Sequence, residues 1–333
     1  MRKIIFLSTI LPSAILIILL FVFSSEKEKI SDVNYQDAFR KNYKIFSPII
    51  PESVDFAGEN APLNIFYIRE KLDEEILRNT YFHSSTIGLI KRSNRWFPLI
   101  EPILSENNIP EDFKYLALIE SGFENVVSPK GARGFWQFME KTAREYGLEV
   151  NDAIDERYNV EKSTKAACKC LLDFYDEFKN WTLVAAAYNT GKRRIRESLE
   201  KQKVNNYYDL YLNEETSQYV FRILAIKTII ESPTRYGFYL READLYPPVP
   251  TKKIKVTKTI PDLYEFASMH KINYRTLKMF NPWLRTDKLP DKSGRTYFIK
   301  IPKTGYFKYD KLDKQVKDYD RIFNDTLTVD ELN

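Results

Sequence analysis

Apolar residues at helical spacing are the feature that most constrains how this chain can fold. Within residues 64–108, Phe97, Ile100 and Leu104 recur at intervals of three or four, so they share one helix face. Residues 109–231 carry two further stripes: Ala166, Ala167, Cys170, Leu171, Phe174 and Phe178, then Val220, Ile223, Leu224 and Ile230, with Lys227 interrupting the second. This region lacks the alternation of apolar and polar residues that is typical of strands. We therefore predict an α-helical domain over residues 61–235.

A change of composition after this region predicts a second, smaller domain. Pro247, Pro248 and Pro250 stiffen an expected linker over residues 236–253, because proline fixes φ and disfavours helix in the residue before it. Beyond the linker, the pattern predicts a strand, two helices and a strand, at 253–257, 263–270, 274–280 and 297–301. The expected fold class is mainly α, with a small α+β domain of β-α-α-β order at 254–302 and a polar tail at 303–333.

The N-terminus carries a pattern typical of membrane insertion. Arg2 and Lys3 precede an uncharged stretch over residues 4–23, and about 20 apolar residues cross the core of a bilayer. Positive charge in front of the stretch keeps the N-terminus in the cytoplasm, so the rest of the chain is expected outside it. Residues 1–25 are predicted to be a membrane anchor, or alternatively a cleaved signal segment. Residues 26–60 are expected to form a tether.

Composition excludes several functional classes. The net charge of +5 is spread among interspersed acids and bases without a dense basic block, so we expect no nucleic-acid partner. The only histidines, His83 and His270, lie far apart and outside any metal-ligand motif, so neither a metal nor a cofactor is expected. Cys168 and Cys170 point to different helix faces, and so close a pair makes a poor disulfide. The sequence does not indicate which oligomeric state the protein adopts.

One carboxylate stands at the end of an expected buried helix. Phe113, Ala117 and Glu120 share one face of residues 110–122, and the other faces are also apolar. Burial of a carboxylate without partners is costly, so the pKa of Glu120 should rise. A carboxyl group that stays protonated near neutral pH can act as a general acid. The alternative is an exposed glutamate at a helix end.

Two further segments add polar groups set among aromatic rings. The glycine-rich loop 128–134 leads into residues 135–139, where Gln137 is flanked by large apolar rings. This combination suits a sugar with an N-acetyl group, although Gln137 could instead only cap a helix. A helix of small residues from Trp181 ends near Asn189, whose amide could face a cleft or cap the helix end.

These segments carry a resemblance to a known family. Glu120-Ser121, residues 131–139 (Gly-Ala-Arg-Gly-Phe-Trp-Gln-Phe-Met) and residues 186–191 (Ala-Ala-Tyr-Asn-Thr-Gly) resemble, in order and spacing, the three signature motifs of family 1 lytic transglycosylases. Residues 109–121, 155–157 and 215–220 resemble its membrane-bound D-type branch. The likeness covers about 108–231. It implies a fold like that of goose-type lysozyme, with peptidoglycan glycan strands as the substrate.

The resemblance also implies a mechanism and site residues. Glu120 would protonate the oxygen of the β-1,4 bond between N-acetylmuramic acid and N-acetylglucosamine, then act as base on the muramoyl 6-hydroxyl. The product would be a 1,6-anhydro sugar. Ser121 would hydrogen-bond near the reaction centre. The saccharide cleft would be lined by Gln137, Tyr188, Asn189 and Tyr219. Other nearby carboxylates, expected in solvated or capping roles, are Glu124, Asp152 and Asp155. Departures from the family pattern that can alter the cleft are Phe135, Trp136, Glu140 and Thr190.

The C-terminal domain resembles a LysM peptidoglycan-binding module. Residues 274–284 and 299–302 carry this likeness, and Ile260-Pro261-Asp262 replaces the usual glycine-aspartate-threonine turn. The module could bind glycan or be a small packing domain without a ligand. For the whole chain, two alternatives to a lytic transglycosylase stay open. One is a hydrolytic muramidase on the same fold, and the other is an inactive wall-binding protein.

Overall fold

The computed structural model describes residues 37, 41, 45–290, 294–318 and 320–326. The chain divides into two units, Met1–Ser47 and Pro48–Asn333. The membrane segment expected at residues 1–25 lies outside the described residues. Among the residues that are described, no helix is both long enough and apolar enough to cross a membrane.

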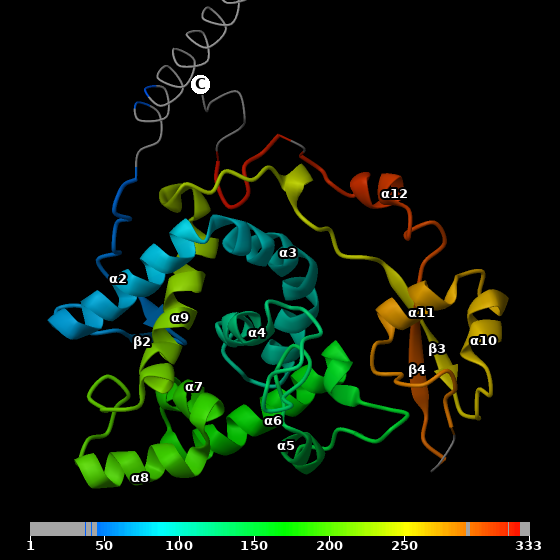
Figure 1. The fold of residues 1–333 in the computed structure, drawn as a ribbon, viewed down its shortest axis with the longest axis horizontal. Helices are drawn as coiled ribbons and strands as arrows, with labels where there is room; N and C mark the ends of the chain where they lie inside the picture. Colours follow the sequence, from blue (N-terminus) through cyan, green and yellow to red (C-terminus); the bar gives the residue numbers. More distant parts are fainter. Residues whose placement is uncertain (1–36, 38–40, 42–44, 291–293, 319, 327–333) are drawn as a thin grey trace, which may run out of the picture. The chain divides into compact units, whose positions relative to one another are not determined.

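The larger unit is mainly helical (Figure 1). Its α-helices before the C-terminal domain are α2 (Phe66–Tyr81), α3 (His83–Glu106), α4 (Phe113–Ser121), α5 (Glu140–Glu145), α6 (Val160–Phe178), α7 (Trp181–Thr190), α8 (Lys192–Gln202) and α9 (Glu214–Glu231). Short 3₁₀ helices are η1 (Glu156–Tyr158), η2 (Pro233–Tyr236) and η3 (Glu242–Asp244). The prediction of a mainly α fold is confirmed. Most of the apolar residues of these helices form one core cluster.

Helix α4 brings Glu120 into this core. It packs against α3 and α9 and lies inside the arc that they form in Figure 1. The buried residues of α4 before Glu120 are Phe113, Tyr115, Leu116, Ala117 and Leu118. At the start of the helix, Asp112 accepts a hydrogen bond of 2.7 Å from the ammonium of Lys227 on α9. The residue that interrupts the apolar stripe of α9 therefore anchors α4, and the expected burial of this helix is confirmed.

Residues that were expected in the tether form part of the helical core instead. A hairpin of β1 (Asp55–Phe56) and β2 (Glu59–Asn60) precedes α2. Phe56 is fully buried, and its ring packs edge-on against the ring of Phe113 on α4, with the two ring centres 5.0 Å apart. Glu59 accepts hydrogen bonds from the backbone N–H of Trp181 and of Thr182, at 2.6 and 2.9 Å. A carboxylate at a helix N-terminus is favourable, so the hairpin stabilises the start of α7.

The C-terminal domain has the predicted β-α-α-β order. Its elements are β3 (Thr251–Val256), α10 (Leu263–Met269), α11 (Tyr274–Phe280) and β4 (Tyr297–Pro302), followed by α12 (Tyr309–Asp313). Strands β3 and β4 pair antiparallel, with Ile254 opposite Ile299. The apolar faces of the strands and helices form a second core cluster. The small α+β domain predicted from the sequence is therefore confirmed.

The expected linker and the expected tail, on either side of this domain, both pack on the helical core. Phe238 and Leu240, in the expected linker, are buried with the helices. In the expected tail, Ile322 is 1% exposed. Its neighbour Asn324 donates to the carbonyl of Ile230 on α9 at 2.8 Å. Phe323, which follows Ile322 directly, packs against the helical core, so the chain returns to the helices after α12.

Candidate active site

Glu120 lies in the last turn of α4, and Tyr219 of α9 donates its hydroxyl to one of its carboxylate oxygens. Glu120 is half-buried, and Tyr219 is buried. Burial raises the pKa of Glu120 from its ordinary 4.5 to about 7, although the Tyr219 hydrogen bond stabilises the carboxylate and lowers the pKa. A carboxyl group with a pKa near neutrality can give and take a proton at physiological pH.

The charged neighbours of Glu120 come mostly from α9. Glu215 raises the pKa of Glu120, because a second negative charge disfavours ionisation, and Arg222 lowers it. Tyr188 belongs to the same cluster, since the negative charge of Glu120 contributes, after burial, to a raised pKa of its phenol. The structure therefore brings together three residues that were expected in the site: Glu120, Tyr188 and Tyr219.

Ser121 ties the end of α4 to the loop that follows it in the site. Its hydroxyl donates to the carbonyl of Phe135 at 3.0 Å, and its oxygen accepts from the N–H of Phe123 at 3.1 Å. The resemblance placed Ser121 near the reaction centre. The bonds that the structure gives it are to backbone groups, so its visible role is to hold the start of residues 135–139.

The loop that carries Gln137 is folded tightly against the segment before α6. Gly134 has a φ of +76°, and a Cβ atom at this position would lie 2.0 Å from the carbonyl oxygen of Arg157. Gln137 has a φ of +46°, which is uncommon for a residue other than glycine and often marks a functional site. Its side-chain amide donates to the carbonyl of Gly134 at 2.7 Å. The loop therefore fixes the Gln137 amide through its own backbone.

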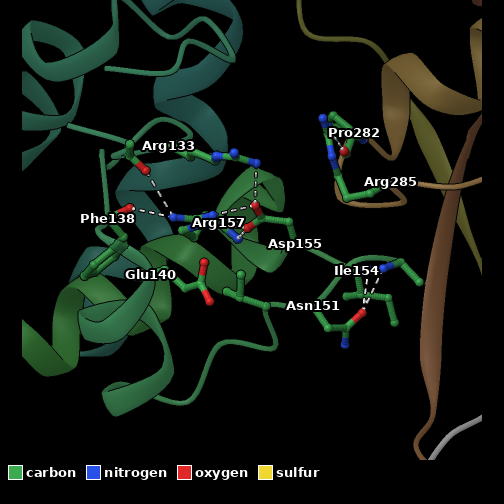
Figure 2. A network of polar contacts seen from close by, with 12 residues as sticks. Arg133, Phe138, Glu140, Asn151, Ile154, Asp155, Arg157, Pro282 and Arg285 are labelled. Atoms are coloured by element: carbon green, nitrogen blue, oxygen red, sulfur yellow. Dashed lines mark hydrogen bonds and ion pairs between the residues drawn. The ribbon is translucent and has the colours of Figure 1, made fainter. Parts of the chain in front are cut away.

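A buried ion pair supports this loop from behind (Figure 2). Arg157 donates from Nε and from a terminal nitrogen to the two carboxylate oxygens of Asp155, each at 2.8 Å. Its remaining nitrogen lies 3.3 Å from the carbonyls of Gly131 and Phe138. Both side chains of the pair are about 3% exposed. Besides placing residues 155–157 in the family resemblance, the sequence analysis expected Asp155 to be a solvated or capping residue. The structure shows that it caps η1 and also neutralises the buried Arg157.

Tyr188 and Asn189 lie in the last turn of α7. Tyr188 donates its hydroxyl to the carbonyl of Trp136 at 2.6 Å. Asn189 uses its side-chain oxygen to accept a hydrogen bond of 2.9 Å from the hydroxyl of Thr216 on α9. Both residues thus join α7 to the other walls of the site. These contacts are within the protein, so the expected contacts of both residues with a saccharide stay a prediction.

The other carboxylates near Glu120 in sequence are engaged or exposed. Glu124 is exposed and forms an ion pair of 3.2 Å with Arg92. Asp152 is exposed as well, and Asp155 belongs to the buried pair. Within the described ranges, no three His, Cys, Asp or Glu side chains come together as a metal site. The chemistry that the arrangement supports is proton transfer by one carboxyl group.

Two family matches fall within the two folded parts, one in each. Residues 98–210 match the family described as "Transglycosylase SLT domain", and residues 252–305 match the "Soluble lytic transglycosylase C-terminal LysM-like domain". The first match contains Glu120, Gln137 and Asn189 but ends before Tyr219. The resemblance predicted from the motifs is confirmed by these matches.

Known proteins similar to this chain carry related names. The membrane-bound lytic murein transglycosylase D of Escherichia coli K12 is 28% identical over 242 residues, 71% of this chain and 52% of the relative. The protein of that name from Escherichia coli O6:H1 gives the same values. The chain spans about half the length of these relatives. Among solved structures, the 70 kDa soluble lytic transglycosylase of Escherichia coli aligns with a TM-score of 0.36 at 23% identity, over 42% of this chain and 24% of that chain.

Proposed function

We propose that this chain, which carries an SLT transglycosylase domain and a LysM-like domain, is a peptidoglycan lytic transglycosylase. The observation that carries the proposal is Glu120 itself. Within the SLT match, it is a half-buried carboxyl group whose pKa is raised by burial to about 7 and whose oxygen accepts a hydrogen bond from Tyr219. The substrate is the β-1,4 bond between N-acetylmuramic acid and N-acetylglucosamine.

In the proposed reaction, Glu120 serves first as acid and then as base. It gives its proton to the bridging oxygen, and the bond from that oxygen to the anomeric carbon of the muramoyl sugar breaks. The 6-hydroxyl of the same sugar attacks the anomeric carbon while the Glu120 carboxylate removes the hydroxyl proton. Tyr219 stabilises the carboxylate between the two steps, because a hydrogen bond donated to the charged form favours it.

Intramolecular attack explains why one carboxylate is sufficient. An ordinary glycosidase needs a second carboxylate as nucleophile or as base for water. Here Glu124 is paired with Arg92 at the surface, and Asp155 is committed to Arg157. The 6-hydroxyl is already tethered to the reacting ring, and a well-oriented tethered group lowers a barrier by up to roughly 7–11 kcal/mol.

The products test this proposal against hydrolysis. We expect purified peptidoglycan, digested in oxygen-18 water, to yield fragments that end in unlabelled 1,6-anhydro-N-acetylmuramic acid, because no water enters the reaction. Mass spectrometry of the fragments measures both the missing water and the label. Reducing N-acetylmuramic acid ends that carry oxygen-18 as the main product would show a hydrolytic muramidase, and undigested glycan would indicate an inactive wall-binding protein.

The pH dependence of cleavage should report Glu120. Because the acid must be protonated, we expect activity to fall as the pH rises through about 7. Tyr219→Phe removes a hydrogen bond that lowers the pKa of Glu120, so the falling limb should move to higher pH. Tyr207→Phe is the matched control. It also removes a buried tyrosine hydroxyl, which donates at 2.9 Å to the carbonyl of Thr216 on α9, the helix that carries Tyr219. An unmoved limb in Tyr219→Phe, or equal shifts in both variants, would contradict this assignment.

We also propose that the enzyme acts outside the cytoplasm, where peptidoglycan is its partner. The support is Arg2 and Lys3 followed by the uncharged stretch 4–23, together with the membrane-bound relative. Residues 1–25 are proposed as a membrane anchor or a signal segment. Cell fractionation with N-terminal sequencing distinguishes the two, since a cleaved signal releases a trimmed soluble protein.

A further inference from the structure

The segment 151–158 connects the helical core to the LysM-like domain. The Asn151 side chain accepts hydrogen bonds from the N–H groups of Ala153 and Ile154, both at 2.9 Å, and so shapes a tight turn. Beyond the turn, the N–H of Asp155 donates to the Trp283 carbonyl at 2.9 Å. In return, the N–H of Arg285 donates to the Ala153 carbonyl at 2.8 Å. The two parts of the chain therefore share a short antiparallel bridge.

Side chains reinforce this bridge on both sides. Ile154 is 1% exposed and belongs to the apolar core of the LysM-like domain, not to the helical core. The guanidinium of Arg285 lies 4.6 Å from the ring centre of Tyr158. Glu149 accepts a hydrogen bond of 2.9 Å from the hydroxyl of Tyr297 on β4. A buried apolar anchor with polar contacts around it is typical of a specific interface, not of two domains on a loose tether.

The bridge leads directly to the loop of the candidate active site. Asp155, whose backbone is held by the LysM-like domain, holds Arg157 through its carboxylate. Arg157 contacts the carbonyls of Gly131 and Phe138, on either side of Gln137. Figure 2 shows the part of this sequence that runs from Asp155 through Arg157 to Phe138, with Ile154 next to Asp155 in the chain. The two side chains that transmit these contacts, Asp155 and Arg157, are each about 3% exposed.

We infer that the LysM-like domain is an integral support of the active site, which positions the loop 131–138 through Ile154, Asp155 and Arg157. This inference rests on the proposed function. Ile154 anchors the segment, and Asp155 and Arg157 are positioning residues that act through the loop and do not touch the substrate. A substrate-binding group that shifts by about one ångström can cost two orders of magnitude in rate, so a support of this kind affects catalysis from a distance.

A matched pair of substitutions in the full chain tests the support. Ile154→Ala and Ile299→Ala remove the same atoms from the same core cluster, at 1% and 0% exposure. Their losses of stability should therefore be similar. Ile299 lies on β4, away from the bridge in sequence, whereas Ile154 is part of the bridge. KM and kcat are measured on soluble glycan fragments, with the folded fraction determined by circular dichroism.

The split between KM and kcat separates positioning from simple destabilisation. We expect Ile154→Ala to raise KM about tenfold, as an active-site loop that loses its support binds glycan less well. Ile299→Ala should leave KM unchanged, because partial unfolding removes active enzyme and lowers only the apparent kcat. Equal KM values in the two variants and the unaltered protein, or equal increases in both variants, would overturn the inference.

A second variant keeps the test decisive if Ile154→Ala does not fold. Arg157→Lys keeps the positive charge next to Asp155 but cannot make the paired hydrogen bonds of a guanidinium. We expect it to raise KM as well, with an unchanged falling limb in the pH profile, because Glu120 is untouched. An unchanged KM in Arg157→Lys would also overturn the inference. Failure of the proposed function is distinguishable, since the unaltered chain would then release no anhydro products.

Discussion

Glu120→Gln is expected to reduce glycan cleavage by about 100- to 10,000-fold, the usual contribution of a general acid or base. The substitution keeps the size of the side chain and an oxygen that can accept the hydrogen bond from Tyr219. It removes only the group that titrates. The rate of release of anhydro fragments measures the effect. A variant that cleaves at a rate near that of the unaltered protein would exclude Glu120 as the acid.

Glu124→Gln is the matched control for this substitution. Glu124 lies four positions further along the chain, is exposed and pairs with Arg92 at the surface. Exposed ion pairs contribute little to stability, so we expect Glu124→Gln to retain both fold and activity. Glycan binding should persist in both variants. Loss of binding in Glu120→Gln alone would indicate that Glu120 contacts the saccharide mainly as a ligand.

The raised pKa of Glu120 also sets the sign of a stability effect. Burial favours the protonated form of Glu120 in the folded state. Between pH 4.5 and about 7 the group ionises in the unfolded chain but stays mostly protonated in the folded protein, so the folded protein loses stability as the pH rises through this range. Glutamine has no charged form. Above pH 7 the Glu120→Gln variant should therefore be at least as stable as the unaltered protein. Loss of activity together with undiminished stability identifies a functional group, not a structural one.

The burial around Glu120, the proposed acid, could be predicted from the sequence because its signal is local. A helix with apolar residues on every face leaves Glu120 little access to water, and this pattern can be read within about ten residues. The pairing of Glu120 with Tyr219 spans 99 positions. Only the family resemblance indicated Tyr219, since nothing in the composition of α9 distinguishes this tyrosine from the others in the chain.

The support behind the loop could not be predicted from the sequence. Asp155 and Arg157 are two charged residues in a polar stretch, where solvation is the usual outcome. Their burial depends on carbonyls at Gly131 and Phe138 and on the backbone of Trp283, which are distant in sequence. Phe56 illustrates the same limit, because one aromatic residue in a polar segment gives no periodic signal.

Gly134→Ala is expected to destabilise the protein and to lower activity strongly. A Cβ atom at this position would lie 2.0 Å from the Arg157 carbonyl oxygen, so the backbone itself has to move. Overpacking costs about 1–3 kcal/mol, and the φ of +76° adds backbone strain for any residue with a side chain. The displaced loop carries Gln137 and the carbonyl that Ser121 holds. We therefore expect both a lower melting temperature and a higher KM.

Gly131→Ala separates the two causes. Gly131 has a similar φ of +86°, but nothing lies within 4 Å of the Cβ that alanine would add. It therefore carries the backbone strain without the clash. Thermal unfolding of both variants measures the difference, and Gly134→Ala should melt at a clearly lower temperature. Equal melting temperatures would mean that the loop gives way easily at Arg157, and the close contact of Gly134 with that residue would then contribute little to holding the loop in place.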